Sequence, residues 1–274
     1  MKGHKRIEFI KFLIMFALLF IFLIPFLMII LNTFKTTQKF VDNPISWPVQ
    51  FNFDNYIQAF DDMNFAMGFV NSIIITVIGV LGIVLFSSMT AYLFARFKWN
   101  INKVLFFIMI ASMAVPFQVI MIPLVTIYGN IGFLDSIQTL LFMYLGCGVP
   151  FAIFTFHGFI KGIPVALEEA AAIDGCSKLR TFFQIVLPLL KPILSTVIVL
   201  DVLWIWNDYL LPSLVLLSPE LKTLPLSTYN FFSSYSVDFS PLMAGLVMSL
   251  IPVLILYLFL QKYIIEGISE GALK

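Results

Sequence analysis

The sequence predicts an all-α integral membrane protein, and its composition and hydropathy pattern carry that prediction. Of the 274 residues, 61% are hydrophobic and only 11% are charged, whereas about a quarter of the residues in a soluble domain are charged. The apolar residues lie in uncharged stretches of about twenty, which is the length that a helix needs to cross a bilayer. Because backbone polar groups must be paired inside lipid, and these runs are too long for barrel strands, each run is expected to be a helix.

Six stretches qualify as transmembrane helices. They cover residues 10–31, 69–95, 104–128, 137–159, 193–217 and 241–262, with approximate ends. The first follows several basic residues, as a secretory signal core would. However, its apolar run is longer than such a core, and the exit Asn32-Thr33-Phe34-Lys35 lacks a small-x-small cleavage site. We therefore expect the first stretch to remain as a helix and residues 1–274 to form a single transmembrane domain.

The distribution of basic residues predicts the orientation. Most Lys and Arg residues would lie on one side of a six-helix bundle, namely Lys2, Lys5, Arg6, Lys11, Arg96, Lys98, Lys103, Lys161, Lys178, Arg180, Lys191, Lys262 and Lys274. Only Lys35, Lys39 and Lys222 would lie on the other side. Because the side rich in Lys and Arg is the cytoplasmic one, both termini are expected in the cytoplasm.

Prolines and long connections interrupt the apolar pattern. Pro116 and Pro123 fall within the third stretch and should bend or locally break it, because proline removes a backbone donor. The outer segments 32–68 and 218–240 are long enough to suggest a role of their own.

The inner segment at about 159–192 is predicted to begin with a short helix that stops abruptly. Pro164 suits the first helical position, and Glu168 and Glu169 lie where the helix dipole favours acids. Alanines of high helix propensity follow, and Gly175 can adopt the left-handed conformation that ends a helix.

A second helix is expected directly after this stop. Ser177 can cap it, and it should end near Leu187, because the residue before Pro188 resists helical geometry. A helix, a stop and a helix on the cytoplasmic face form either a docking element for a soluble partner or a helix lying on the lipid surface. The residue properties alone leave both interpretations open.

One pattern within this segment resembles a known motif. Glu169-Ala170-Ala171, three residues, Gly175, nine residues, Ile185, one residue and Leu187-Pro188 are similar to the EAA loop of bacterial ABC importer permeases. In that family the loop is a coupling helix, which sits in a groove of the ATPase subunit and transmits its closure to the pore. The resemblance implies that coupling to the ATPase involves Glu168, Glu169, Ala170, Ala171, Asp174, Gly175, Ile185, Leu187 and Pro188.

The resemblance covers about residues 55–274 and is to the shorter, six-helix permease of the maltose-transporter type. Stretches that carry it include Asn71-Ser72, Ala91-Tyr92 to Arg96-Phe97, and Trp206-Asn207-Asp208. It implies a multi-pass protein of the bacterial inner membrane, paired with a second homologous permease, two ATPase subunits and an extracytoplasmic substrate-binding protein. It also implies a C-terminal contact with the ATPases through Glu266, Gly267, Gly271 and Lys274.

The chain itself is expected to be non-catalytic and to hold no cofactor. It contains no Gly-x-x-x-x-Gly-Lys-Ser/Thr phosphate loop, so ATP and Mg are expected on the partner ATPase subunits. Cys147, Cys176, His4 and His157 are too isolated for a disulfide framework or a metal site. A net charge of +1 without a basic patch gives no indication of a nucleic-acid partner.

Polar residues within the fifth stretch are candidates for the translocation path. Ionisable groups inside a span normally face the bundle interior or water, and Asp201 and Asp208 would share one helix stripe with Trp204. We hypothesise that Asn207 and Asp208 line the path, with Asp201, Trp204 and Asn71 as further candidates. The alternative is that these polar groups only hold helices together.

The sequence therefore predicts the permease subunit of an ATP-driven importer that moves a sugar, with oligosaccharides as the leading class, by alternating access. One alternative is an ion-coupled secondary transporter that uses Asp201 and Asp208 as coupling carboxylates. That alternative predicts an internal inverted repeat, which the sequence does not clearly show, and it leaves the inner segment unexplained. Another alternative is a membrane scaffold or channel subunit.

Overall fold

The apolar stretches form helices whose ends are set by prolines, caps and polar residues. The computed structural model describes the backbone of residues 2–232 and 237–272, and the side chains of 7–232, 237–259 and 261–262. The chain divides into two compact units, one comprising residues up to 66 with 227–252, the other 67–226 with 253 onward. Among the described residues, the only extended pairing is an isolated antiparallel bridge between Phe232 and Val237.

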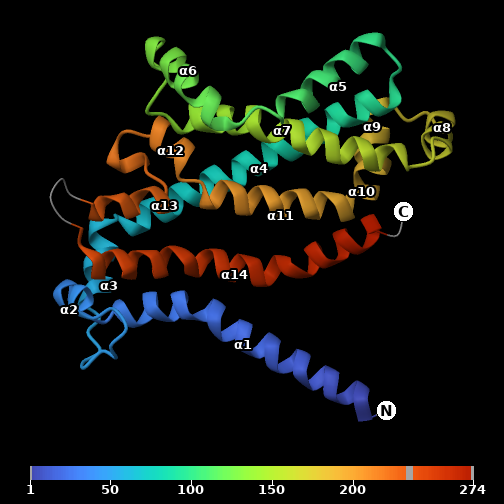
Figure 1. Cartoon of the computed structure of the whole chain (residues 1–274). Coiled ribbons are helices and arrows are strands. Elements are labelled where there is room, and N and C mark those ends of the chain that lie inside the picture. The colour runs from blue at the N-terminus through green and yellow to red at the C-terminus, as the bar shows by residue number, and fades with distance from the viewer. Residues whose placement is uncertain (1, 233–236, 273–274) are drawn as a thin grey trace. The chain divides into compact units, whose positions relative to one another are not determined.

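The first unit is built from helices near both ends of the chain (Figure 1). Its elements are α1 (Lys2–Asn32), α2 (Thr37–Asp42), α3 (Asp54–Asp62), η3 (Thr228–Phe231) and the first part of α14 (Phe239–Ala272). Asp238, just before α14, accepts hydrogen bonds from the Thr37 hydroxyl at 2.6 Å and from Gln58 Nε2 at 3.2 Å. One carboxylate thereby joins α2 and α3 to the start of α14.

Helix α1 presents apolar side chains on every side. From Ile7 to Leu27 each residue is exposed, and a helix that is apolar all round suits a lipid environment. The helix ends where polar contacts begin, because the buried Asn32 Nδ2 donates to the carbonyls of Met28 at 2.7 Å and Pro44 at 2.9 Å.

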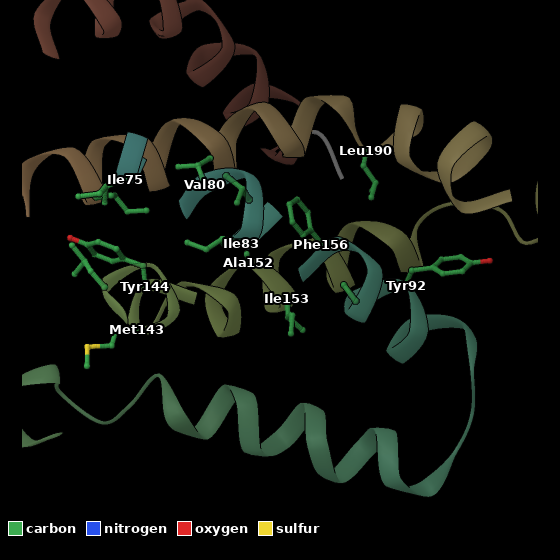
Figure 2. Close-up of a cluster of buried hydrophobic side chains, with 14 of the residues drawn as sticks. Ile75, Val80, Ile83, Tyr92, Met143, Tyr144, Ala152, Ile153, Phe156 and Leu190 are labelled. Carbon is green, nitrogen blue, oxygen red and sulfur yellow. The ribbon is translucent and has the colours of Figure 1, made fainter. Parts of the chain in front are cut away.

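The second unit contains most of the remaining long helices and the inner segment. Its elements are α4 (Phe65–Arg96), α5 (Asn100–Ser112), α6 (Phe117–Asn130), α7 (Ile137–Lys161), α8 (Ala166–Ile173), α9 (Lys178–Thr181), the π-helix η1 (Phe182–Val186), α10 (Leu187–Leu189), α11 (Lys191–Asn207), α12 (Leu210–Val215), η2 (Pro219–Leu221) and α13 (Leu224–Ser227). Figure 2 shows part of its core, in which Val80 and Ile83 of α4 gather with Ile153 and Phe156 of α7.

Small residues let α4, α7 and α11 approach closely. A Cβ on Gly148 of α7 would lie 2.5 Å from Cδ1 of Ile83 and 3.2 Å from Cζ3 of Trp204. A Cβ on Gly79 of α4 would lie 3.1 Å from Cδ1 of Ile205. Because helices in lipid gain little from hydrophobic burial against one another, such close packing is a main source of their association.

Four of the described helices overlap expected spans, and two further pairs of helices are each sharply bent. Helices α1, α4, α7 and α14 are each long and apolar enough to cross a membrane. The pair α5 and α6 is bent by 103°, and the α9 to α10 segment is bent by 78° against α11; six spans result if each bent pair is one span. The expected break at Pro116 is confirmed, because Pro116 precedes α6, whereas Pro123 lies inside α6.

The fifth stretch is not the continuous helix that was expected over 193–217. Helix α11 ends at Asn207, and Asp208 is extended, with φ −71° and ψ 127°. The Asp208 carboxylate then accepts hydrogen bonds from the backbone N–H groups of Leu210 at 3.0 Å and Leu211 at 3.4 Å, at the start of α12. Asp208 therefore does not share a helix stripe with Asp201, because its side chain stabilises a break in the helix.

The second helix of the inner segment also continues past its expected end. It runs through Pro188 to Leu189, because the turn Phe182–Val186 is a π-helix. The N–H of Leu187 donates to the carbonyl of Phe182, five residues earlier. This wider turn accommodates proline, which lacks the N–H for a regular helical bond.

The packing at Gly148 can be tested by substitution. We expect Gly148→Ala to destabilise the protein by about 1–3 kcal/mol, because Ile83 is fully buried and cannot easily move away from the added methyl group. Gly158→Ala is the matched control in the same helix, since nothing lies within 4 Å of its added Cβ. Thermal unfolding of the purified protein in detergent measures both, and equal melting temperatures would contradict this account of the packing.

Candidate functional site: the coupling segment and the polar residues of the bundle

Helix α8 is the short, stopped helix that the sequence predicts. It begins at Ala166 and ends at Ile173, so Pro164 precedes the helix by two residues and does not occupy the first helical position as predicted. Gly175 has a φ of +82°, and the N–H of Cys176 donates to the carbonyl of Ala171 at 2.9 Å. This six-to-one hydrogen bond around a left-handed glycine is the Schellman motif, so the predicted stop at Gly175 is confirmed.

The second helix is anchored in the core of the second unit. Ser177 caps it as expected, because its hydroxyl accepts a hydrogen bond from the N–H of Arg180 at 3.3 Å. Phe182 and Val186 are buried, as is Leu190 at the following bend. The motif residues Ile185 and Leu187 are partly buried, and Pro188 is exposed. The second helix therefore fixes the segment 166–190 to the core of the second unit.

The two adjacent glutamates of α8 have different surroundings. Glu168 Oε1 lies 2.6 Å from Arg96 Nε, and its other oxygen accepts a hydrogen bond from the Tyr92 hydroxyl at 2.8 Å. Glu169 is exposed, as are Ala170 and Asp174. Glu169 is thus free to meet another subunit, while Glu168 is occupied within the chain.

The exposed face of α8 is apolar as well as acidic. Ile173 is 87% exposed and Leu167 is 45% exposed. Leu179 of the following helix is 62% exposed. Exposed apolar side chains on a segment outside the long helices are typical of a surface that another protein covers. Ala171 is buried, so its small side chain suits this position.

The polar candidates of the bundle fall into separate environments. Asn71 is buried, and its Nδ2 donates to the carbonyls of Glu220 at 2.8 Å and Lys222 at 3.1 Å, so it holds the outer segment. Asp201 is buried, and its Oδ2 has no hydrogen-bond partner among the described residues. Asn207 is exposed and donates to the carbonyl of Leu203 at 2.7 Å.

Trp204 borders a hollow at the break between α5 and α6. The hollow has a volume of about 550 Å³ and is lined mainly by aromatic and aliphatic side chains, among them Phe117, Tyr128, Phe142, Phe151 and Trp204. Trp204 is 39% exposed, and its ring packs edge-on against Tyr144, at 5.4 Å between centroids. Tyr144 in turn donates its hydroxyl to Asp208 Oδ2 at 2.9 Å. Asp208 thereby connects the α11 break to α7.

A further polar site, at Asp135, was not predicted from the sequence. Asp135 adopts a left-handed φ of +59°, and its carboxylate accepts hydrogen bonds from the N–H groups of Leu217 at 2.8 Å and Ser218 at 2.7 Å and from the Ser218 hydroxyl. These hydrogen bonds, with that of the Ser218 hydroxyl foremost, lower the pKa of Asp135. The sequence signal was slight: an Asp between Gly132 and the N-cap Ser136, in a short connection.

The comparisons with known proteins identify the family. The model of the family "Binding-protein-dependent transport system inner membrane component" matches residues 83–270. The chain belongs to this family. It is therefore a multi-pass, non-catalytic permease component of the inner membrane, and the family implies that a separate ATPase subunit binds ATP.

Curated relatives resemble this permease over most of their length. The "Probable starch degradation products transport system permease protein AmyC" of Thermoanaerobacterium thermosulfurigenes is 44% identical over 247 residues, which is 90% of each chain. The "Multiple sugar-binding transport system permease protein MsmG" of Streptococcus mutans is 37% identical over 89% of each chain. The "Melibiose/raffinose/stachyose import permease protein MelC" of Bacillus subtilis is 34% identical over 83% of each chain.

A solved structure confirms the fold of the permease. A chain from the crystal structure of a bacterial ABC transporter involved in the import of the acidic polysaccharide alginate superposes with a TM-score of 0.82. The match covers 96% of this chain and 98% of the other, at 23% sequence identity. At that identity the likeness shows the fold alone.

Some predicted contacts lie where the structure gives little detail. Lys274 is outside the described residues. Glu266, Gly267 and Gly271 lie in α14, of which only the backbone is described at these positions. Their contact with the ATPases remains a prediction. Among the described residues no group of three or more His, Cys, Asp or Glu could hold a metal ion.

The Asp135 contacts predict a pH dependence. Because folding lowers the pKa of Asp135, its stabilising contribution is fully present above the unfolded pKa of about 3.9 and is lost as the pH falls through the lower, folded value. Asp135→Asn should therefore melt at a lower temperature than wild type between about pH 5 and pH 7, with the difference vanishing in stronger acid. Asp42→Asn, at an exposed carboxylate, is the control. A difference that stayed constant into acid would contradict the assignment.

Proposed function

We propose that this permease pairs with a second homologous permease and two ATPase subunits to form an ATP-driven importer of sugars, with oligosaccharides as the leading substrate class. The observation that carries the proposal is the coupling segment, in which α8 projects an acidic and apolar surface at the spacing of the family motif. The family supplies the binding-protein-dependent context. The sugar class is supported by the names of the relatives, which refer to starch degradation products, multiple sugars, and melibiose, raffinose and stachyose.

The orientation and the partners follow from the same proposal. The excess of Lys and Arg on one side supports a cytoplasmic location for both termini and the coupling segment, on the side where ATPase subunits bind ATP and Mg. Each bent pair of helices then counts as one span, and residues 1–274 form a single permease domain with six spans. The outer segment near 217–240 would meet the substrate-binding protein. One solved relative of the fold comes from an alginate ABC transporter in complex with a pentasaccharide-bound periplasmic protein.

Transport would proceed by alternating access. Closure of the ATPase dimer moves the coupling segment, and the bundle shifts from an inward-open to an outward-open packing. The ion-coupled alternative is less well supported, because the chain belongs to a binding-protein-dependent transport family. One of its two coupling carboxylates, Asp208, is also engaged by Tyr144 and by two backbone N–H groups.

Variants of the coupling segment test the proposal. In the complete complex, Glu169→Lys should abolish ATP-dependent uptake of a labelled oligosaccharide panel, because it reverses the charge of an exposed coupling residue. Gly175→Val should also reduce uptake, because its φ of +82° costs a residue with a Cβ about 1–2 kcal/mol. The matched control is Gly132→Val, at a left-handed glycine outside the coupling segment.

The two outcomes are distinct. If both coupling variants insert normally and lose uptake while Gly132→Val retains it, the coupling role stands and the panel identifies the substrate. Uptake that survives Glu169→Lys and Gly175→Val, or that needs only an ion gradient, would refute the proposed function.

Trp204 and Asn207 are the exposed candidates for contact with the sugar, since Asn71 and Asp208 are engaged within the chain. Trp204→Ala should raise the KM of uptake about 2- to 10-fold, because stacking of an aromatic ring is worth about 0.5–1.5 kcal/mol. Trp204→Phe should recover part of the loss. Phe107→Ala, at a residue 71% exposed on α5, is the control. An unchanged KM in Trp204→Ala would remove this residue from the path.

A further inference from the structure

The inner end of α4 is joined to the coupling helix by a network of three side chains. Arg96, the last residue of α4, places Nε 2.6 Å from Glu168 Oε1 and donates from Nη2 to the carbonyl of Ile163 at 2.8 Å. Tyr92, one turn earlier, donates its hydroxyl to Glu168 Oε2 at 2.8 Å. Both carboxylate oxygens of Glu168 are therefore bound to α4, and we call Tyr92, Arg96 and Glu168 the inner clamp.

The inner clamp is shielded from water. The side chains of Arg96 and Glu168 are each only 11% exposed, and a charge-assisted hydrogen bond in such a site is shorter and stronger than a neutral one. Removing one partner of a buried ion pair leaves the other charge uncompensated. Aromatic rings lie beside the clamp. The ring centroids of Phe182 and Tyr92 are 5.3 Å apart, and Lys178 Nζ lies 4.2 Å from the centroid of the Phe97 ring. The coupling helix is thus held firmly against α4.

Both covalent routes from α8 toward the bundle are interrupted. On the N-terminal side, residues 162–165 join α8 to α7, which contains an internal proline, Pro150. On the C-terminal side, the chain passes the π-turn Phe182–Val186 and then the 78° bend before α11. Such interruptions are the places where a helical chain can absorb a change in direction. By contrast, α4 runs for 32 residues from Phe65 to Arg96 without an internal proline. Helix α4 is therefore the connection from the coupling helix across the bundle that has neither a break nor an internal proline.

The outer end of α4 contacts a different part of the chain. Asn71 Nδ2 donates to the carbonyls of Glu220 and Lys222, and the Ser72 hydroxyl accepts a hydrogen bond from the N–H of Leu224 at 2.8 Å. These contacts fix the outer segment 220–224 to α4. The same helix therefore holds the coupling helix at one end and an outer segment at the other.

We propose that the inner clamp makes α4 the rod through which movement of the coupling helix reaches the outer segment 220–224, with Arg96 and Glu168 as positioning residues. This inference rests on the proposed function and deepens it. It assigns the two neighbouring glutamates separate roles: Glu169 meets the ATPase, and Glu168 passes the displacement to α4. The displacement is transmitted mechanically, without a covalent step.

The test compares ATP hydrolysed per sugar imported in the reconstituted full complex with its binding protein. Arg96→Gln and Glu168→Gln should raise this ratio about tenfold, within the range of ~5- to 150-fold that coupling free energies produce. Arg96→Lys should lie between them and wild type, because an ammonium cannot reach Glu168 and the Ile163 carbonyl together as a guanidinium does. Lys98→Gln, which removes an exposed charge two residues away, should leave the ratio unchanged.

A purely structural role would lower the amount of complex but not the ratio. Should the glutamine variants fail to assemble, Tyr92→Phe removes a single hydrogen bond and is still expected to raise the ratio. Ratios equal to wild type in assembled Arg96, Glu168 and Tyr92 variants would overturn the inference. Wild-type uptake that is ATP-dependent and sensitive to Glu169→Lys, measured in the same preparation, keeps the proposed function separate from that result.

A double variant tests whether both ends of α4 belong to one route. Arg96→Gln and Asn71→Ala are combined, and stimulation of ATP hydrolysis by the sugar-loaded binding protein is measured. If α4 is the rod, the double variant is no worse than the more severe single variant, because the route is already interrupted. Losses that multiply would indicate independent actions and would overturn the assignment of α4 as the connection.

Discussion

The close packing of α4 against α7 and α11 is the constraint on which the second unit depends. It is possible only because Gly79 and Gly148 carry no side chain where Ile205 and Ile83 approach. This packing sets the orientation of α4 within the second unit. It thereby sets the positions of Arg96 at one end of the helix and of Asn71 near the other. The polar contacts at both ends are therefore consequences of an apolar fit in the middle.

The helices that surround this packing are interrupted rather than straight, and each interruption satisfies its freed backbone groups locally. At the α11 end the carboxylate of Asp208 accepts from two N–H groups of α12. At the other end the π-turn carries the helix across Pro188, which has no N–H to offer. Irregular backbone within a bundle is tolerable only where such partners exist or water is present. The helix breaks are thus stabilised parts of the fold.

Local signals explain why much of this could be predicted from the sequence. Helix α8, its stop at Gly175 and the cap at Ser177 depend on neighbouring residues, and all three agree with the prediction. The end of α11 does not, because the Asp208 carboxylate accepts hydrogen bonds from two backbone N–H groups of α12 and also from Tyr144, 64 residues away. The contacts of Glu168 and Asp135 likewise join residues distant in sequence. The helical periodicity of one sequence does not reveal such contacts between distant residues.

The proposed rod also indicates where the flexibility must lie. A link between the coupling helix and an uninterrupted helix can transmit displacement but cannot itself supply two packings. Two packings require elements that absorb changes in φ and ψ, and in the second unit the sharp bends are those between α5 and α6 and before α11. The hollow beside Trp204 lies at the first of these bends. A displacement carried by α4 would therefore change the shape of that hollow while α4 itself remained an unbroken helix.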